Sequence, residues 1–124
     1  MNAPQHYKYF TYEEFQSPDI PGSGVLMEPT FLMMLDSARG MAAIPFKITS
    51  GYRSRNHNEA IGGSPTSSHL KGLAVDIAYN SERDAVRIIA CLSRAGFVRI
   101  GKGDGFIHVD LDHDKVHPAY WDYG

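Results

Sequence analysis

The spacing of apolar residues predicts two main helices in this chain. Pro29 suits the first turn of a helix, and apolar residues then recur every three to four positions: Phe31, Leu35, Ala38 and Ala42. A second amphipathic stretch begins near Ser81 and ends at Gly96, and its apolar face comprises Ala85, Ile88, Ile89 and Leu92. Two shorter helices are predicted, one where Thr11 starts a capping-box sequence and one where Ser54 precedes a segment that a pair of glycines ends.

Apolar and β-branched residues predict four strands, at residues 45–52, 73–78, 97–100 and 106–111. The last two strands are separated by five residues, three of them glycine, which is typical of a hairpin turn. Helices come first and the strands follow without regular alternation. This order favours an α+β fold with a small antiparallel sheet and helices packed on one face, rather than a doubly wound parallel sheet.

The length of 124 residues predicts a single domain over residues 1–124. The formal net charge of -2 and the scattered Lys and Arg residues argue against a nucleic-acid partner. Cys91 is the one cysteine of the chain, which excludes an internal disulfide, and its helical apolar setting favours a packed thiol over a nucleophile. We therefore expect an ordinary globular domain, and a monomer.

The N-terminal residues 1–10 lack the charged start and apolar run of a secretory signal, and no segment reaches the roughly 20 apolar residues of a membrane span. We therefore expect a protein that is made soluble in the cytoplasm, without a signal peptide and without a transmembrane segment.

Three polar residues stand in or beside apolar strands. Asp76 interrupts the apolar segment 73–78, His69 precedes that segment, and His108 lies within the segment 106–111. A carboxylate in such a setting is costly unless it is paired or binds a cation. Two imidazoles and one carboxylate would leave a fourth zinc position open for water, which favours a hydrolytic site over a structural one. The same pattern is also compatible with hydrogen-bonded core residues, and spacing alone does not decide between the two interpretations.

The wider sequence resembles the zinc D-alanyl-D-alanine carboxypeptidases, a family grouped with lysostaphin-type endopeptidases and the hedgehog signalling domain. The resemblance rests on the S-G-Y-R-S sequence at residues 50–54, on S-x-H-x-x-G-x-A-x-D at residues 67–76 and on F-I-H-V-D at residues 106–110. Residues 10–48 look like the lead-in of short, single-domain members.

This resemblance implies that zinc is held by His69, Asp76 and His108, in a cleft on the face of the sheet opposite the helices. It also implies that Arg53 binds the substrate carboxylate or the oxyanion, and that Ser67 supports the substrate site as a polar contact. The implied substrates are peptidoglycan stem peptides or muropeptides, cut at a bond next to a D-amino acid.

The general base is where the sequence departs from the family pattern. Relatives supply a Glu or Asp three residues before the last zinc ligand, or a His two residues before it, but Gly105 and Phe106 occupy these positions. Asp104 on the predicted turn is one alternative, although turn chemistry also explains it. Asp110 is another, and its position two residues after His108 better suits a carboxylate that orients the ligand histidine.

The segment after the last predicted strand is interpreted as less important for function. We expect a solvated loop around four polar residues, namely Asp112, His113, Asp114 and His117, unless this loop folds back over the cleft. We expect Tyr120 and Trp121 to cover the core rather than to bind a ligand. Two other functions remain open: an endopeptidase that cuts another stem or cross-bridge bond such as L-Ala–D-Glu, and a zinc-stabilised module that has lost catalysis. The absent signal fits either a phage-type lysis enzyme released by other means or a cytoplasmic peptidase of wall fragments.

Overall fold

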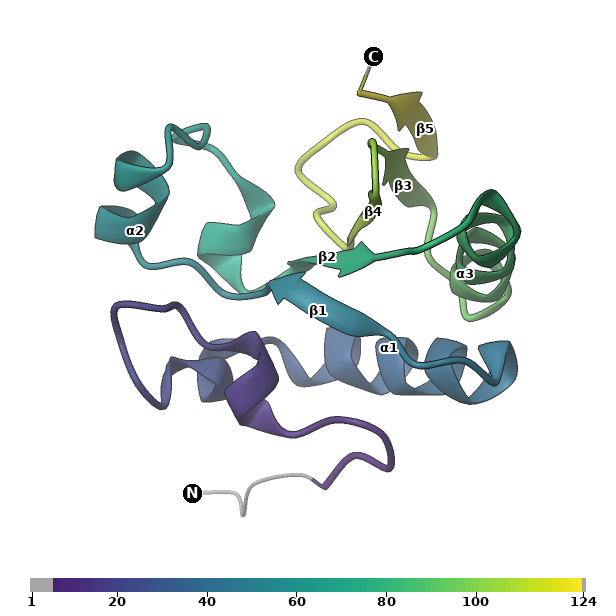
Figure 1. Ribbon diagram of the computed structural model, residues 1–124. Helices are drawn as coiled ribbons and strands as arrows, with labels where there is room; N and C mark the ends of the chain where they lie inside the picture. The colour runs from purple at the N-terminus through teal and green to yellow at the C-terminus, as the bar shows by residue number, and fades with distance from the viewer. Residues whose placement is uncertain (1–5, 124) are drawn as a thin grey trace.

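The computed structural model describes residues 6–123 and has an α+β fold, with a five-stranded sheet and three α-helices (Figure 1). The first five residues of the N-terminal segment 1–10 lie outside the described part. The helices are α1 (Pro29–Ala42), α2 (Arg55–Ala60) and α3 (Glu82–Arg94). The strands are β1 (Lys47–Ser50), β2 (Ala74–Ala78), β3 (Arg99–Lys102), β4 (Phe106–Asp110) and β5 (Ala119–Asp122).

The strand order is β1-β2-β4-β3-β5, and every neighbouring pair is antiparallel except β3 and β5, which run parallel. Strands β2, β4 and β3 therefore each have a partner on both sides, and β4 is the middle strand. The predicted strand at 97–100 is observed two residues later, at Arg99–Lys102, and the Phe97 N–H instead donates to the Leu92 carbonyl oxygen of α3 at 3.1 Å. Strand β5 was not predicted at all.

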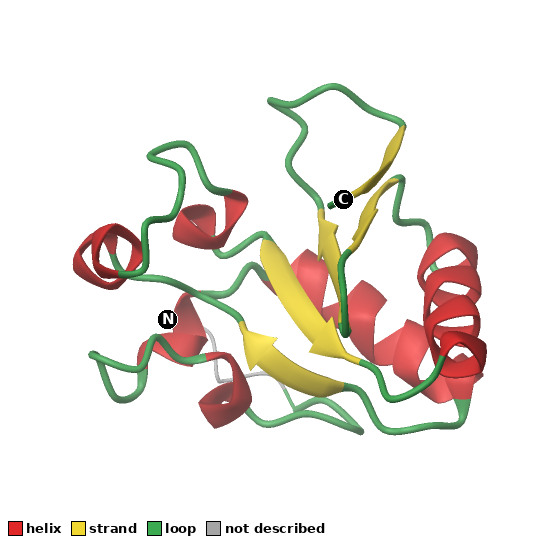
Figure 2. Cartoon of the chain, turned by 45° about the horizontal axis from the view of Figure 1, so that its top comes forward, coloured by secondary structure: helices red, strands yellow, loops and turns green. Residues whose placement is uncertain are grey.

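The hydrophobic core lies between the sheet and two of the helices (Figure 2). The buried face of α1 consists of Phe31, Leu32, Leu35, Ala38 and Ala42, which confirms the predicted periodicity. Helix α3 contributes Ala85, Ile88, Cys91 and Leu92, while Ile89 is only partly buried. Cys91 is a buried free thiol, as predicted. The apolar side chains of β2 and β4 complete this core from the sheet.

Local capping explains where several helices begin. The Ser54 hydroxyl accepts a hydrogen bond from the His57 N–H at 3.0 Å, and the Ser81 hydroxyl accepts one from the Asp84 N–H at 3.1 Å. Thr11 precedes a single 3-10 turn, Tyr12–Phe15, and its N–H donates to the Glu14 carboxylate. Within residues 6–123, no helix has the length and apolar character needed to cross a membrane.

Candidate metal centre

Two neighbouring strands place Asp76 and His108 side by side. Strands β2 and β4 are antiparallel, and Asp76 is the direct cross-strand partner of His108. Their neighbours along each strand belong to the hydrophobic core: Val75, Ile77, Ile107 and Val109. Because side chains alternate along a strand, Asp76 and His108 project from the opposite face, away from α1 and α3.

A short 3-10 helix, Ser68–Lys71, brings His69 to the same place. The Ser67 hydroxyl caps this helix and accepts a hydrogen bond from the His69 backbone N–H at 3.2 Å. The imidazole Nδ1 of His69 lies 2.7 Å from the Gly51 carbonyl oxygen. Since a carbonyl only accepts, Nδ1 must carry the proton, and Nε2 is left with its lone pair on the side of Asp76.

Three ligand atoms converge as a consequence. Asp76 Oδ1 lies 3.1 Å from His108 Nδ1 and 3.5 Å from His69 Nε2, and the three atoms all lie within 4.8 Å of one another. Two ligands of a tetrahedral zinc, each about 2.1 Å from the ion, are about 3.4 Å apart. Two imidazole nitrogens and one carboxylate oxygen at these separations fit a zinc ion without rearrangement of the strands. No other group of three or more potential metal ligands is found among the described residues.

The carboxylate of Asp76 and the imidazole of His108 each shift the pKa of the other. Burial alone would raise the pKa of Asp76, but hydrogen bonds and charge from His108 and His69 outweigh it and hold that pKa well below its usual range. Burial would lower the pKa of His108, but its hydrogen bonds to Asp110 and Asp76 raise it overall. Asp76 therefore stays ionised at neutral pH, as a metal ligand must.

Asp110 contacts the Nε2 side of the His108 ring, which points away from the other two ligands. Its Oδ2 lies 2.8 Å from His108 Nε2, so the imidazole can donate Nε2–H to Asp110 while Nδ1 faces the ligand cluster. The other oxygen accepts from Arg99 Nε at 2.7 Å and from the Asp112 N–H at 3.1 Å. With 1% of its surface exposed, Asp110 is placed to orient the histidine, and its oxygens are already engaged.

Arg53 lies at the edge of the triad. Its Nη2 is 3.7 Å from Asp76 Oδ2, while Nε donates to Ser50 Oγ at 3.2 Å and Nη1 to Asn58 Oδ1 at 3.3 Å. Burial lowers the pKa of the guanidinium, and the Asp76 charge opposes that shift. Arg53 and Ser67 both line the hollow that contains the triad. The Ser67 hydroxyl also supports the site indirectly, through its hydrogen bond to the His69 backbone.

The hollow above the triad has a volume of about 370 Å³. Besides the triad and Arg53, its charged and aromatic lining residues are Arg99, Phe106, Asp110, Lys115, Trp121 and Tyr123. Asp104 is exposed and is not among the lining residues. It borders a neighbouring hollow together with Glu82 and Lys102. The geometry therefore does not bring Asp104 to the metal ligands.

The C-terminal strand forms a wall of this hollow, which the sequence interpretation missed. The Trp121 ring centre lies 5.6 Å from that of His108, and Tyr123 stacks against Phe106 at 5.2 Å. Gly101 makes room for the indole, since a Cβ at that position would lie 2.4 Å from the ring. Trp121 was expected to cover the core, but it pairs with Gly101 across β5 and β3, and its ring lies beside His108 on the site face of the sheet. Tyr120, also expected over the core, is exposed.

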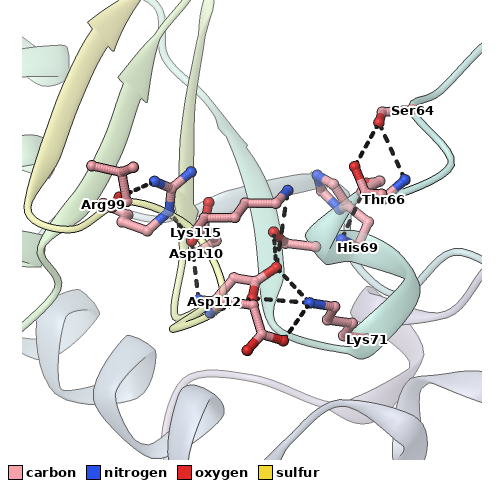
Figure 3. Close-up of polar contacts among 12 residues, drawn as sticks. Ser64, Thr66, His69, Lys71, Arg99, Asp110, Asp112 and Lys115 are labelled. Atoms are coloured by element: carbon pink, nitrogen blue, oxygen red, sulfur yellow. Dashed lines mark hydrogen bonds and ion pairs between the residues drawn. The ribbon is translucent and has the colours of Figure 1, made fainter.

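The expected solvated loop is also partly buried. Asp112 has 1% of its surface exposed. Its carboxylate accepts hydrogen bonds from the Ser68 hydroxyl at 2.7 Å and from the Lys71 ammonium at 3.0 Å (Figure 3). This pairing fixes residues 112–115 beside the 3-10 helix that carries His69. His113, Asp114 and His117 are exposed, as predicted.

Two features of the sequence could have indicated this wall, although neither was used to predict it. A glycine inside a strand often marks the close approach of another group, and Gly101 occupies such a position. The four residues after Pro118, Ala-Tyr-Trp-Asp, have the composition of a short strand. Neither signal identifies the partner strand, however. Arg99 and Lys115 gave no signal that distinguishes them from ordinary surface cations.

The comparisons with known proteins bear on the same region. No curated protein matches the chain. The sequence model of the family described as Peptidase M15 matches residues 8–110, which is most of the chain and includes His69, Asp76 and His108. Members of this family are zinc metallopeptidases. The fold, the ligand geometry and this match agree, and the chain belongs to the Peptidase M15 family.

Proposed function

We propose that the protein is a zinc-dependent peptidase that hydrolyses peptide bonds next to D-amino acids in peptidoglycan stem peptides, in the manner of a D-alanyl-D-alanine carboxypeptidase. The observation that carries the proposal is the convergence of His69, Asp76 and His108 at spacings that suit zinc, with Arg53 beside them. When bound, zinc supplies a Lewis acid that polarises a carbonyl group and makes a coordinated water more acidic.

The residues of the chain have distinct tasks in this proposal. Arg53 binds the terminal carboxylate of the substrate, because its contact with Asp76 is long and a planar guanidinium makes paired bonds to a carboxylate. Asp110 keeps the His108 ring in one orientation. Trp121 and Phe106 shield the reacting bond from bulk water on one side of the hollow.

The positions expected for a general base do not supply a proton acceptor. Gly105 and Phe106 carry no proton-transfer group, Asp104 borders another hollow, and the Asp110 oxygens are engaged by His108, Arg99 and a backbone N–H. These observations favour one second candidate, a zinc-binding module of the cell wall without catalytic activity. Cleavage of another bond, such as L-Ala–D-Glu, would use the same zinc ligands and a different placement of the substrate.

One experiment separates these functions. Purified muropeptides are incubated with the zinc-loaded protein, with the protein plus a chelator, and with the Asp76→Ala variant, and new amines and fragment masses are recorded. Loss of a terminal D-alanine that needs zinc and Asp76 supports the carboxypeptidase, and another fragment mass identifies an endopeptidase. Binding of one zinc per chain without cleavage of any muropeptide contradicts a peptidase. Activity on wall fragments would leave either a lytic or an intracellular role to be tested in cells.

A further inference from the structure

The hollow above the triad is lined by more cationic than anionic side chains. Three cationic side chains line it, Arg53, Arg99 and Lys115, against two carboxylates, Asp76 and Asp110. A divalent ion at the triad would add further positive charge. Because the whole chain carries a net charge of -2, this excess is local. A hollow with an excess of positive charge favours an anionic ligand.

Two of the three cations have close partners. The Arg99 guanidinium lies 2.7 Å from the buried Asp110 and also donates to the Val116 carbonyl oxygen. Arg53 has three partners within the site, among them Asp76. Their charges therefore have a structural use before any substrate binds.

Lys115 differs from both of these arginines. Its ammonium lies 3.9 Å from Asp112, and that carboxylate already accepts hydrogen bonds from Ser68 at 2.7 Å and from Lys71 at 3.0 and 3.1 Å. The Lys115 backbone N–H donates to the Asp112 carbonyl oxygen at 3.2 Å, a bond that any residue other than proline would make at this position. Figure 3 shows the Lys115 side chain extended from the C-terminal segment toward the His69 side of the site.

We infer that Lys115 is a substrate-binding residue that holds a second carboxylate of the peptide, distinct from the one that Arg53 holds. The inference rests on the proposed peptidase function and specifies its substrate as a peptide with at least two carboxylates. Lys115 lies beyond residue 110, where the family match ends. Stem peptides offer two sources of such a carboxylate, D-glutamate and diaminopimelate.

The test uses two matched pairs of stem peptides. In one pair the α-carboxylate of D-glutamate is free or amidated, and in the other the side-chain carboxylate of diaminopimelate is free or amidated. Cleavage by the zinc-loaded protein gives kcat and KM, and calorimetry on the metal-free protein, which cuts no bond, gives the affinity. The variants are Lys115→Met, Lys115→Arg and the control Lys47→Met, which removes an exposed cation on β1 outside the hollow.

We expect the wild type to prefer the free carboxylate in one of the pairs, with a KM lower by about tenfold, since a charge-assisted bond is lost on amidation. Lys115→Met should abolish that preference by raising KM for the peptide with the free carboxylate to that of the amidated one, while Lys115→Arg and Lys47→Met should retain it. No preference in either pair, or a preference that survives in Lys115→Met, would overturn the inference. A wild type that cuts no peptide but binds with a Lys115-dependent preference would overturn the proposed function and leave this inference standing.

Discussion

Two regions of the molecule line the same hollow, and they are built in different ways. The triad stands on β2 and β4, which each pair with a strand on both sides, and on a 3-10 helix capped by Ser67. The C-terminal wall, residues 111–123, consists of a loop and an edge strand that pairs only with β3. Tyr123, at its end, is 53% exposed. The position of the metal ligands therefore follows from sheet register, while the shape of the pocket depends on a segment that can change with less cost to the fold.

The largest effect is expected from Asp76→Ala in the triad. The variant loses one of three ligands and the partner of both imidazoles, so zinc affinity and zinc-dependent cleavage should fall at least 100-fold. Zinc content after dialysis and the rate of muropeptide cleavage measure it. Asp104→Ala serves as the matched control because it removes a carboxylate that borders a different hollow. Retention of one tightly bound zinc in Asp76→Ala would show that the ligand set is wrong.

Arg99→Met tests the link between the two regions. Arg99 lies on β3, pairs with the buried Asp110 and contacts the C-terminal segment through the Val116 carbonyl. Its loss leaves a buried carboxylate without its closest cation, so we expect the free energy of unfolding to fall by about 3 kcal/mol. Urea unfolding of the metal-free protein measures the change, with Arg94→Met as an exposed control. Equal stability of the two variants would mean that Asp110 does not need Arg99.

Gly101→Ala alters the wall without changing any group that touches the metal. The added methyl carbon would lie 2.4 Å from the Trp121 indole, so the ring must move away from His108. We expect a loss of about 2 kcal/mol in stability from overpacking, with zinc affinity retained. Trp121→Ala should remove the clash, and the double variant should be no less stable than Trp121→Ala alone. Additive losses in this double-mutant cycle would indicate that Gly101 acts through another contact.

This contrast also explains what the sequence could predict. Asp76 and His108 stood out as polar residues within apolar strands, and His69 joined them through the motif that resembles the family. The wall depends on the parallel pairing of β5 with β3 and on the pairing of Asp112 with Ser68 and Lys71. These contacts join residues more than ten positions apart and leave no local period. An edge strand of four residues directly after a proline is therefore difficult to predict from a single sequence.

The free energy of unfolding of the protein should respond to pH in opposite directions with and without metal. In the metal-free protein the raised pKa of His108 stabilises the fold below its ordinary value of 6.5, and this contribution is lost as the pH rises through the folded value. The lowered pKa values of Asp76 and Asp110 stabilise the fold above 3.8, and that contribution is lost as the pH falls through their folded values.

We therefore expect the metal-free protein to lose stability as the pH rises above 6.5. The zinc-loaded protein should gain stability over the same interval, because zinc requires deprotonated imidazoles. Urea unfolding across this range, with and without zinc, measures both slopes. His113→Gln, an exposed change in the C-terminal segment, should leave both slopes unaltered. Parallel slopes in the two forms would contradict the proposed coupling of His108 to metal binding.

The smallest effect is expected from Asp104→Ala, which tests where the hollow of the metal centre ends. Asp104 is exposed on the turn between β3 and β4 and borders a neighbouring hollow that shares Tyr123 with the metal centre. If proton transfer needed Asp104, its removal would lower kcat by 100-fold or more. We expect kcat/KM to change less than twofold, since no geometry brings this carboxylate to the triad. Tyr123→Phe is the matched comparison, because it alters the residue common to both hollows. A larger loss of kcat/KM in Asp104→Ala than in Tyr123→Phe would mean that the turn between β3 and β4 approaches the metal centre when substrate binds. That turn would then belong to the wall of the hollow together with β5.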